Sequence, residues 1–252
     1  MSGPSDRRAV IIGRAGSLRR VTRCLREIGW DPVRVEAIRT VPTDIGPPPR
    51  WLQRHPPPDL WIVTSRAVVD TFLRAHPSWK SGLQAIPAIV AVGDDTRHAL
   101  ESAGFGPVRA APGGGSQALE RSLGPLAGRR VVYLRSARAS PELARRLRRR
   151  GARVLSRIVY RVVQGPPLRG RERHRISGAS VWVVTSPSAL EGFRRQLGPA
   201  LFRERIGRVR TYALGGFTAA ALRRAGARRV ADASKSTEEG LTKLLAKELN
   251  DA

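Results

Sequence analysis

Short runs of apolar residues alternate along the chain with longer stretches in which apolar and polar residues follow a helical period. The runs are rich in β-branched and aromatic residues, and most are apolar at every position. Such strands are typically buried on both faces, in a parallel sheet covered by helices. The alternation therefore predicts an α/β, doubly wound fold. The expected strands cover residues 9–13, 60–64, 88–93, 130–134, 180–185 and 209–215.

The pattern occurs twice at an almost constant spacing. The tripeptide VTS returns 121 positions further on, and VGDDT, ending at Thr96, returns as LGGFT, ending at Thr218, after 122 positions. Arg14, behind the first expected strand, matches Arg135 at a spacing of 121. Independent loops would drift by several residues, so this constancy indicates a tandem duplication. We expect two similar α/β domains.

Helix ends and connections are marked by Gly and Pro. Gly104 and Gly226 follow equivalent amphipathic stretches, and we expect each to end a helix. Residues 41–59 and 162–175 are loaded with Pro and Gly, which favours extended connections. The chain is expected to pass between the domains in these two stretches.

The repeated Thr-Ser pairs stand where a buried strand ends and a helix begins. Thr64 and Thr185 end their strands, and Ser65 and Ser186 start the helices. The free amides of a helix's first turn carry partial positive charge and bind carboxylate or phosphate. The alternative is that these serines are ordinary N-caps.

The VGDDT and LGGFT turns repeat this arrangement. We expect Gly93 and Gly215 to let the chain turn sharply as it leaves the strand. Thr96 and Thr218 then place a hydroxyl near the next helix start, with the same N-cap alternative. All four turns lie at carboxyl ends of strands, the usual ligand-binding edge of an open α/β sheet.

Charge adds a preference for an anionic partner. Lys and Arg total 46 against 20 Asp and Glu, a net charge of +26 in a chain of 252 residues. An Arg bias of this kind also reflects a GC-rich genome, so the charge leaves both explanations open. No apolar run is long enough to span a bilayer and the N-terminus lacks a signal-peptide pattern, so we expect a cytoplasmic protein without a membrane partner.

Most catalytic constellations are missing from the sequence. Cys24 is the only cysteine, and no HExxH motif, metal-suited acid cluster or G-x-S-x-G motif occurs. We expect neither a metal nor a cofactor. Tyr160, one of three tyrosines, stands at the edge of the second Pro-rich stretch, where its phenol can donate a proton or simply pack.

The motifs VTSRAVVDTF, VAVGDDTRHALESAG, VVYLRSARASPELARRLRRRGARV, VVTSPSALEGF and ALGGFTAAALRRAG, in this order, resemble the uroporphyrinogen-III synthase family from about Val10 to Leu245. The resemblance implies two similar doubly wound parallel-sheet domains joined by a two-stranded connection. It implies a discontinuous first domain of residues 1–37 and 165–252, a second domain of residues 42–160, and connectors at 38–41 and 161–164.

The resemblance also implies a reaction. Enzymes of this family close the polycarboxylate hydroxymethylbilane to uroporphyrinogen III in tetrapyrrole (haem) biosynthesis, inverting the terminal pyrrole ring without a cofactor. It suggests Tyr160 as proton donor to the departing hydroxyl, with Thr96 and Thr218 as further catalytic residues on the cleft. A monomer is the default expectation. The expected substrate-binding residues are Arg14, Thr64, Ser65, Arg66, Gly93, Thr185, Ser186, Ser188 and Gly215.

The chain departs from the family pattern at its first turn. The family usually has Thr-Arg-Pro where this chain reads GRAG at 13–16, keeping Arg14 alone. Two alternatives to the enzyme therefore stay open. A noncatalytic two-lobed relative that binds anionic ligands is one alternative. A basic nucleic-acid-binding protein is the other, but helix-turn-helix, zinc-finger and aromatic-ribbon patterns are lacking, and RRLRRR at 145–150 reads as a solvated helix, so we expect no specific nucleic-acid partner.

Overall fold

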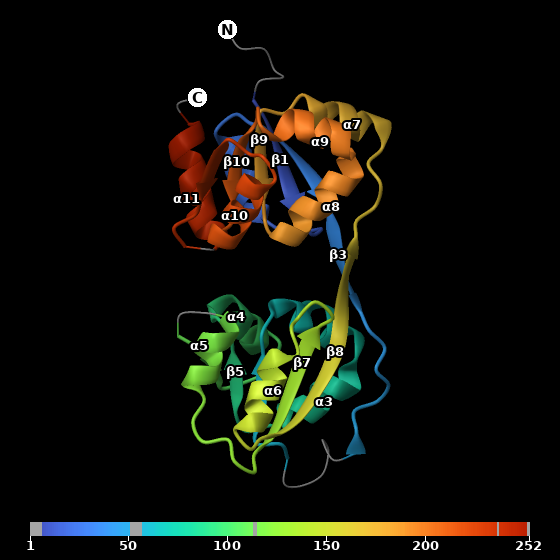
Figure 1. The fold of residues 1–252 in the computed structure, drawn as a ribbon, viewed down its shortest axis with the longest axis vertical. Coiled ribbons are helices and arrows are strands. Elements are labelled where there is room, and N and C mark those ends of the chain that lie inside the picture. The colour runs from blue at the N-terminus through green and yellow to red at the C-terminus, as the bar shows by residue number, and fades with distance from the viewer. Residues whose placement is uncertain (1–6, 51–56, 113–114, 236, 251–252) are drawn as a thin grey trace. The chain divides into compact units, whose positions relative to one another are not determined.

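A computed structural model describes residues 7–50, 57–112, 115–235 and 237–250, and the chain divides into two compact units (Figure 1). Unit 1 contains Met1–Arg39 and Val163–Ala252, and unit 2 contains Thr40–Val162. The chain passes between them in strands β3 (Ile38–Pro42) and β8 (Arg153–Gln164), which are neighbours in one sheet. The expected fold class, two α/β units with parallel-dominated sheets and a two-stranded connection, is confirmed.

Unit 1 is built on a five-stranded sheet in the order β11-β10-β9-β1-β2, in which every pair is parallel. Its strands are β1 (Arg8–Gly13), β2 (Asp31–Glu36), β9 (Val181–Val184), β10 (Arg210–Ala213) and β11 (Arg229–Asp232). Its helices are α1 (Arg19–Glu27), α7 (Gly170–Ser177), α8 (Pro187–Leu197), α9 (Pro199–Ile206), α10 (Gly216–Arg224) and α11 (Glu238–Leu249).

Unit 2 is built on a six-stranded sheet in the order β3-β8-β7-β4-β5-β6. The strands besides β3 and β8 are β4 (Leu60–Val63), β5 (Ile89–Ala91), β6 (Val108–Ala110) and β7 (Arg130–Ser136). Its helices are η1 (Val68–Leu73), α3 (Pro77–Gln84), α4 (Asp94–Ser102), α5 (Gly115–Ser122) and α6 (Glu142–Arg149).

The two sheets have matching strand orders, but their strands are drawn from both halves of the duplication. In unit 1 the order β11-β10-β9-β1-β2 matches β6-β5-β4-β7-β8 in unit 2. Strand β1 of the first copy, with β2 on its other side, thus pairs with β9 of the second copy, while β7 of the second copy, with β8 on its other side, pairs with β4 of the first. The duplicated segments have exchanged their first two strands.

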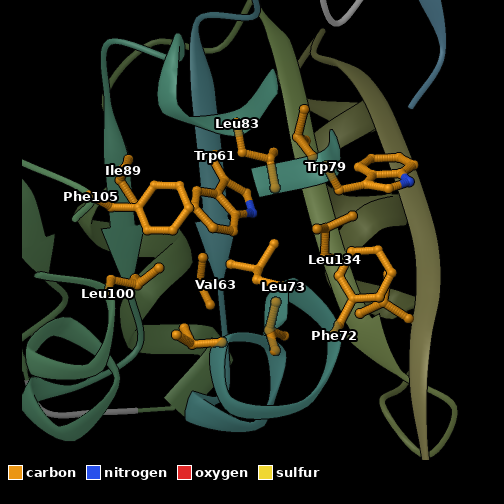
Figure 2. Close-up of a cluster of buried hydrophobic side chains, with 14 of the residues drawn as sticks. Trp61, Val63, Phe72, Leu73, Trp79, Leu83, Ile89, Leu100, Phe105 and Leu134 are labelled. Carbon is orange, nitrogen blue, oxygen red and sulfur yellow. The ribbon is translucent and has the colours of Figure 1, made fainter. Parts of the chain in front are cut away.

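Helices cover both faces of the strands, as continuous apolar runs predict. In unit 1, Trp182 of β9 packs edge-on against Phe193 of α8, with ring centroids 5.0 Å apart. Figure 2 shows the equivalent core of unit 2, where Trp61 of β4 meets Phe105 edge to face at 5.0 Å. Leu147 of α6 is fully buried, so RRLRRR is a solvated helix with one buried stripe, as the sequence predicts.

The helix after the first Thr-Ser pair differs from the amphipathic α-helix that the sequence suggests. Residues Val68–Leu73 form a π-helix, which still buries Val68, Val69, Phe72 and Leu73. Short π segments are frequently found at functional sites.

The predicted helix ends are confirmed. Gly104 and Gly226 have φ of 85° and 99°, the left-handed region in which a side chain would be strained. Among the described residues, none of the helices is both long and apolar enough to cross a membrane.

Candidate functional site

The three central strands of unit 1 end side by side. Because β1, β9 and β10 are parallel and in register, Ile12 pairs with Val184 and Val184 pairs with Ala213. The residues that follow, Arg14, the Thr185–Ser186 pair and Gly215, therefore share the carboxyl edge of one sheet. This edge is the usual ligand site of an open parallel sheet.

The first turn lies tightly against the Thr-Ser turn of β9. Thr185 donates to Ile12 O from its amide at 3.1 Å and from its hydroxyl at 3.2 Å. A Cβ placed on Gly13 would lie 2.6 Å from Ser17 Oγ and 2.9 Å from two side-chain atoms of Thr185. Only glycine permits this approach, so the G of GRAG is required by packing.

The serines of the repeated pair both cap helix starts. Ser186 Oγ accepts from Ala189 N at 3.1 Å, and Ser65 Oγ accepts from Ala67 N at 3.1 Å. The N-cap role that the sequence left open is therefore real. In both units the serine hydroxyl therefore accepts a hydrogen bond from an amide of the helix start.

The second repeated turn places a threonine at the same position in two helices. Gly93 and Gly215 are the N-caps of α4 and α10, and Thr96 and Thr218 are the third residues of these helices. The two threonines are only 7% and 5% exposed. Neither hydroxyl has a hydrogen-bond partner within the described part of the chain.

The chain bends at Gly93 and Gly215 between strand and helix, as expected, but without a backbone conformation that requires glycine. Gly93 has φ −165° and Gly215 has φ −177°, extended conformations that any residue adopts. A Cβ on Gly93 would meet no atom within 4 Å. Glycine is therefore not required there by backbone geometry, and its absent side chain leaves open space beside the start of α4.

Acidic residues at the start of α4 make unit 2 different from unit 1. Asp94 and Asp95 are in the first turn of α4, whereas α8 and α10 have no acid in theirs. Arg66, expected to bind substrate, is paired with Asp70 at 2.9 Å and with Asp95 at 3.0 Å. The acids already complement this helix dipole, so the start of α4 is less favourable for a carboxylate than the start of α10. The letters DD of VGDDT were the signal that sequence reasoning missed.

The two matching arginines also differ. Arg135 in unit 2 bonds Ala139 O at 2.8 Å, Ser156 Oγ at 3.3 Å and Ser136 O at 3.3 Å. The Arg14 guanidinium has no partner among the residues described, whereas its carbonyl accepts from the hydroxyl of Ser17 at 2.7 Å and from the amide of Ser17 at 3.2 Å. Unit 1 therefore keeps a cation at its carboxyl edge for an external anion.

One helix start of unit 1 is closed by the protein itself. Helix α1 begins only at Arg19, and Glu238 of α11 accepts hydrogen bonds from the amides of Arg20 and Val21. Its carboxylate therefore occupies the position that a bound anion would take. Nothing in the local sequence marks this contact, because 218 residues separate Arg20 from Glu238.

Tyr160 is a residue of β8 that lies beside the carboxyl end of β7, where it pairs with Ser136 next to a β-bulge. It is 6% exposed, packs in the core that contains Phe72, and its hydroxyl has no hydrogen bond to a described residue. A second phenol, which the sequence did not single out, is near. Burial raises the pKa of Tyr133, while the side chain of Thr64 and the charge of Arg135 lower it, and Tyr160 raises it slightly.

The arrangement supplies hydrogen-bond donors rather than redox or metal chemistry groups. No cluster of three or more His, Cys, Asp or Glu suited to a metal occurs in the described ranges. Phenols, hydroxyls, free amides and one unpaired guanidinium bind anions and donate protons. Unit 1 brings together Arg14, Thr185, Ser186, Ser188, Gly215 and Thr218, and unit 2 brings together Thr64, Ser65, Arg66, Gly93, Thr96 and Tyr160.

Comparison with known proteins identifies relatives of the whole chain. The family described as "Uroporphyrinogen-III synthase HemD" matches residues 20–243. A uroporphyrinogen-III synthetase structure from Helicobacter pylori is 18% identical with a TM-score of 0.66, covering 96% of this chain and 99% of that one. A mutant uroporphyrinogen III synthase from Thermus thermophilus is 21% identical with a TM-score of 0.61, covering 97% and 99%. No curated protein gives a significant match.

Proposed function

Because this chain belongs to the uroporphyrinogen-III synthase family, we propose that it closes hydroxymethylbilane to uroporphyrinogen III, with inversion of the terminal pyrrole ring. The reaction class is that of a cyclising hydro-lyase in tetrapyrrole biosynthesis. The proposed enzyme acts as a cytoplasmic monomer, without a cofactor.

The observation that carries this proposal is the pair of buried threonines. Thr96 and Thr218 start helices at the same edge of their sheets, and their hydroxyls have no partner among described residues. A substrate carboxylate or pyrrole would supply the missing partner.

Carboxylate binding in this proposal falls mainly to unit 1. The first turns of α8 and α10 contain no acid, and Arg14 is unpaired at the same edge. Amides and a guanidinium together bind carboxylates through charge-assisted hydrogen bonds. The net charge of +26 would also attract the polycarboxylate substrate from solution.

Tyr160 would then act on the leaving hydroxyl. Its phenol donates a proton, the hydroxyl departs as water, and electrons from the adjacent pyrrole nitrogen form the electrophilic methylene that the terminal ring attacks. The remaining steps need the reacting carbons held close while direct closure to the type I isomer is prevented. In this proposal Thr64 and Tyr133, whose side chains interact, would orient this end of the site.

The test couples the protein to an enzyme that generates hydroxymethylbilane and separates the oxidised porphyrin isomers. Type III product above the level without protein supports the proposal, whereas type I alone rules out the reaction and favours a noncatalytic ligand-binding relative. Tyr160→Phe should lower kcat about 100-fold. The matched control is Tyr212→Phe, which removes the buried, unbonded hydroxyl of Tyr212 from the core of unit 1 and should leave kcat unchanged.

A further inference from the structure

Phe217 is the one phenylalanine among the described residues whose side chain is exposed to solvent. It is 92% exposed, whereas Phe72, Phe105, Phe193 and Phe202 are at most 4% exposed. Single exposed apolar residues are common on proteins and need no explanation by themselves. The position of this one is informative, because it is the second residue of α10, immediately before Thr218 at the carboxyl edge of unit 1.

The fold itself does not require a phenyl ring here. The duplicated helix start in unit 2 has Asp95 at the corresponding position, and Asp95 is bonded to Arg66. Both copies form the same helix start, with an extended glycine N-cap and a buried threonine as third residue. Phe217 therefore differs from its counterpart in what it offers to a ligand, not in how it shapes the turn.

The surroundings of Phe217 combine apolar and anion-binding groups. The first amide of α10 that is hydrogen-bonded within the turn is that of Thr218, which donates to Gly215 O at 2.9 Å. The amides of Gly216 and Phe217 come before it, at the helix end where amides lack partners within the helix. Asp232 lies beside Gly216, and its carboxylate is paired with Arg223 at 3.9 Å. A ligand that matches this surface has a flat apolar ring with carboxylates on its rim.

We propose that Phe217 packs against the face of a pyrrole ring of the substrate, while the amides of the same turn bind that ring's carboxylates. This inference rests on the proposed function, since a carboxylated pyrrole is the repeating group of hydroxymethylbilane. Aromatic rings prefer offset or edge contacts, which an exposed ring with no neighbour on either face can adopt. Phe217 is then a specificity-determining residue that distinguishes a carboxylated pyrrole from a plain polycarboxylate.

Fluorine NMR of protein labelled with fluorophenylalanine tests the contact directly. The resonance of Phe217 is assigned from its absence in Phe217→Leu. It should shift on addition of reduced uroporphyrinogen or a monopyrrole bearing acetate and propionate, and stay in place with butanetetracarboxylate. No shift with either pyrrole overturns the inference, and so does a shift that follows protein concentration, which would assign Phe217 to contact between copies of the chain.

Kinetics supply the second readout. Phe217→Ala should raise KM about ten-fold with a smaller effect on kcat, Phe217→Trp should restore KM, and the midpoint of urea unfolding should not change because the ring is exposed. Leu201→Ala on α9 is the control for loss of a partly exposed apolar group away from this turn. Type III product with unchanged KM in Phe217→Ala refutes the inference alone. A pyrrole-dependent NMR shift without type III product from any variant refutes the proposed reaction and leaves the contact standing.

Discussion

Replacing Thr218 with Val tests whether the hydroxyl of Thr218 binds a ligand or stabilises the fold. The side chain is 5% exposed, and its hydroxyl has no hydrogen bond with the described residues. Thr22 in α1 is a matched control in the same unit, because it is 6% exposed but its hydroxyl donates to Leu18 O at 2.8 Å. Both substitutions replace a threonine hydroxyl at a similarly buried helical site. Only the hydroxyl of Thr22 is hydrogen-bonded to a described residue.

The expected magnitudes follow from that difference. Thr22→Val loses a hydrogen bond and should lower the free energy of unfolding by about 0.5–1 kcal/mol. Thr218→Val loses no hydrogen bond to a described residue and should change it by less than about 0.5 kcal/mol. A bond from Thr218 to a substrate carboxylate contributes about 1.5–3 kcal/mol, so kcat/KM should fall roughly 10- to 100-fold in Thr218→Val only.

Urea unfolding and the coupled isomer assay measure the two quantities on the same preparations. If Thr218→Val lowers the unfolding free energy by more than about 1 kcal/mol and retains full turnover, the hydroxyl is structural and the reasoning is refuted. Loss of turnover in Thr22→Val to the same degree would show that the assay reports general destabilisation instead.

Three further predictions concern packing and charge. Gly13→Ala should destabilise unit 1 by about 1–3 kcal/mol, because its Cβ would lie 2.6 Å from Ser17 Oγ; an unchanged urea midpoint would contradict this. Glu238→Ala should cost about 1 kcal/mol by uncapping α1, and Glu238→Gln less, with thermal unfolding as the measurement and equal losses as the contrary result. Hydrogen bonding to Arg194 lowers the pKa of Glu191 to about 2. Because the folded-state pKa lies below the unfolded value of 4.5, the ionised carboxylate stabilises the folded protein above pH 4.5, and this stabilisation disappears as the pH falls towards 2. Glu191→Gln should therefore flatten the loss of stability in that pH window, and identical pH profiles would disprove it.

Much of the fold was predictable because its signals are local. A continuous apolar run such as LWIV describes a strand buried on both faces, and the structure places Leu60–Val63 in the sheet with all four residues buried. Gly104 and Gly226 end helices because their positive φ is set by the turn itself. The helix starts at Ser186 and Thr218 were equally visible, since capping depends on neighbours within three residues.

The character of the site was less predictable, because it depends on residues that meet across the chain. The duplication suggested equivalent turns in both units, but Arg66 is bonded to Asp95, Arg135 to Ala139 O, and only Arg14 keeps an unpaired guanidinium among these arginines. Tyr133 looked like one more apolar strand residue, and only its place beside Thr64 makes its phenol part of the site. Side-chain pairing of this kind is set by strand order and register, which composition does not encode.

The amino-acid sequence by itself determined the elements, their duplication and the positions of the strand-to-helix turns, because apolar periodicity and capping act over a few residues. Tertiary structure decided that β1, with β2 on its other side, pairs with β9 of the other copy rather than with β4 of its own. It also decided that Glu238 closes the start of α1, and that Phe217 remains exposed while Asp95 is bonded. These outcomes depend on which surfaces meet when distant segments pack, and the energies that choose between such pairings arise from the whole core at once.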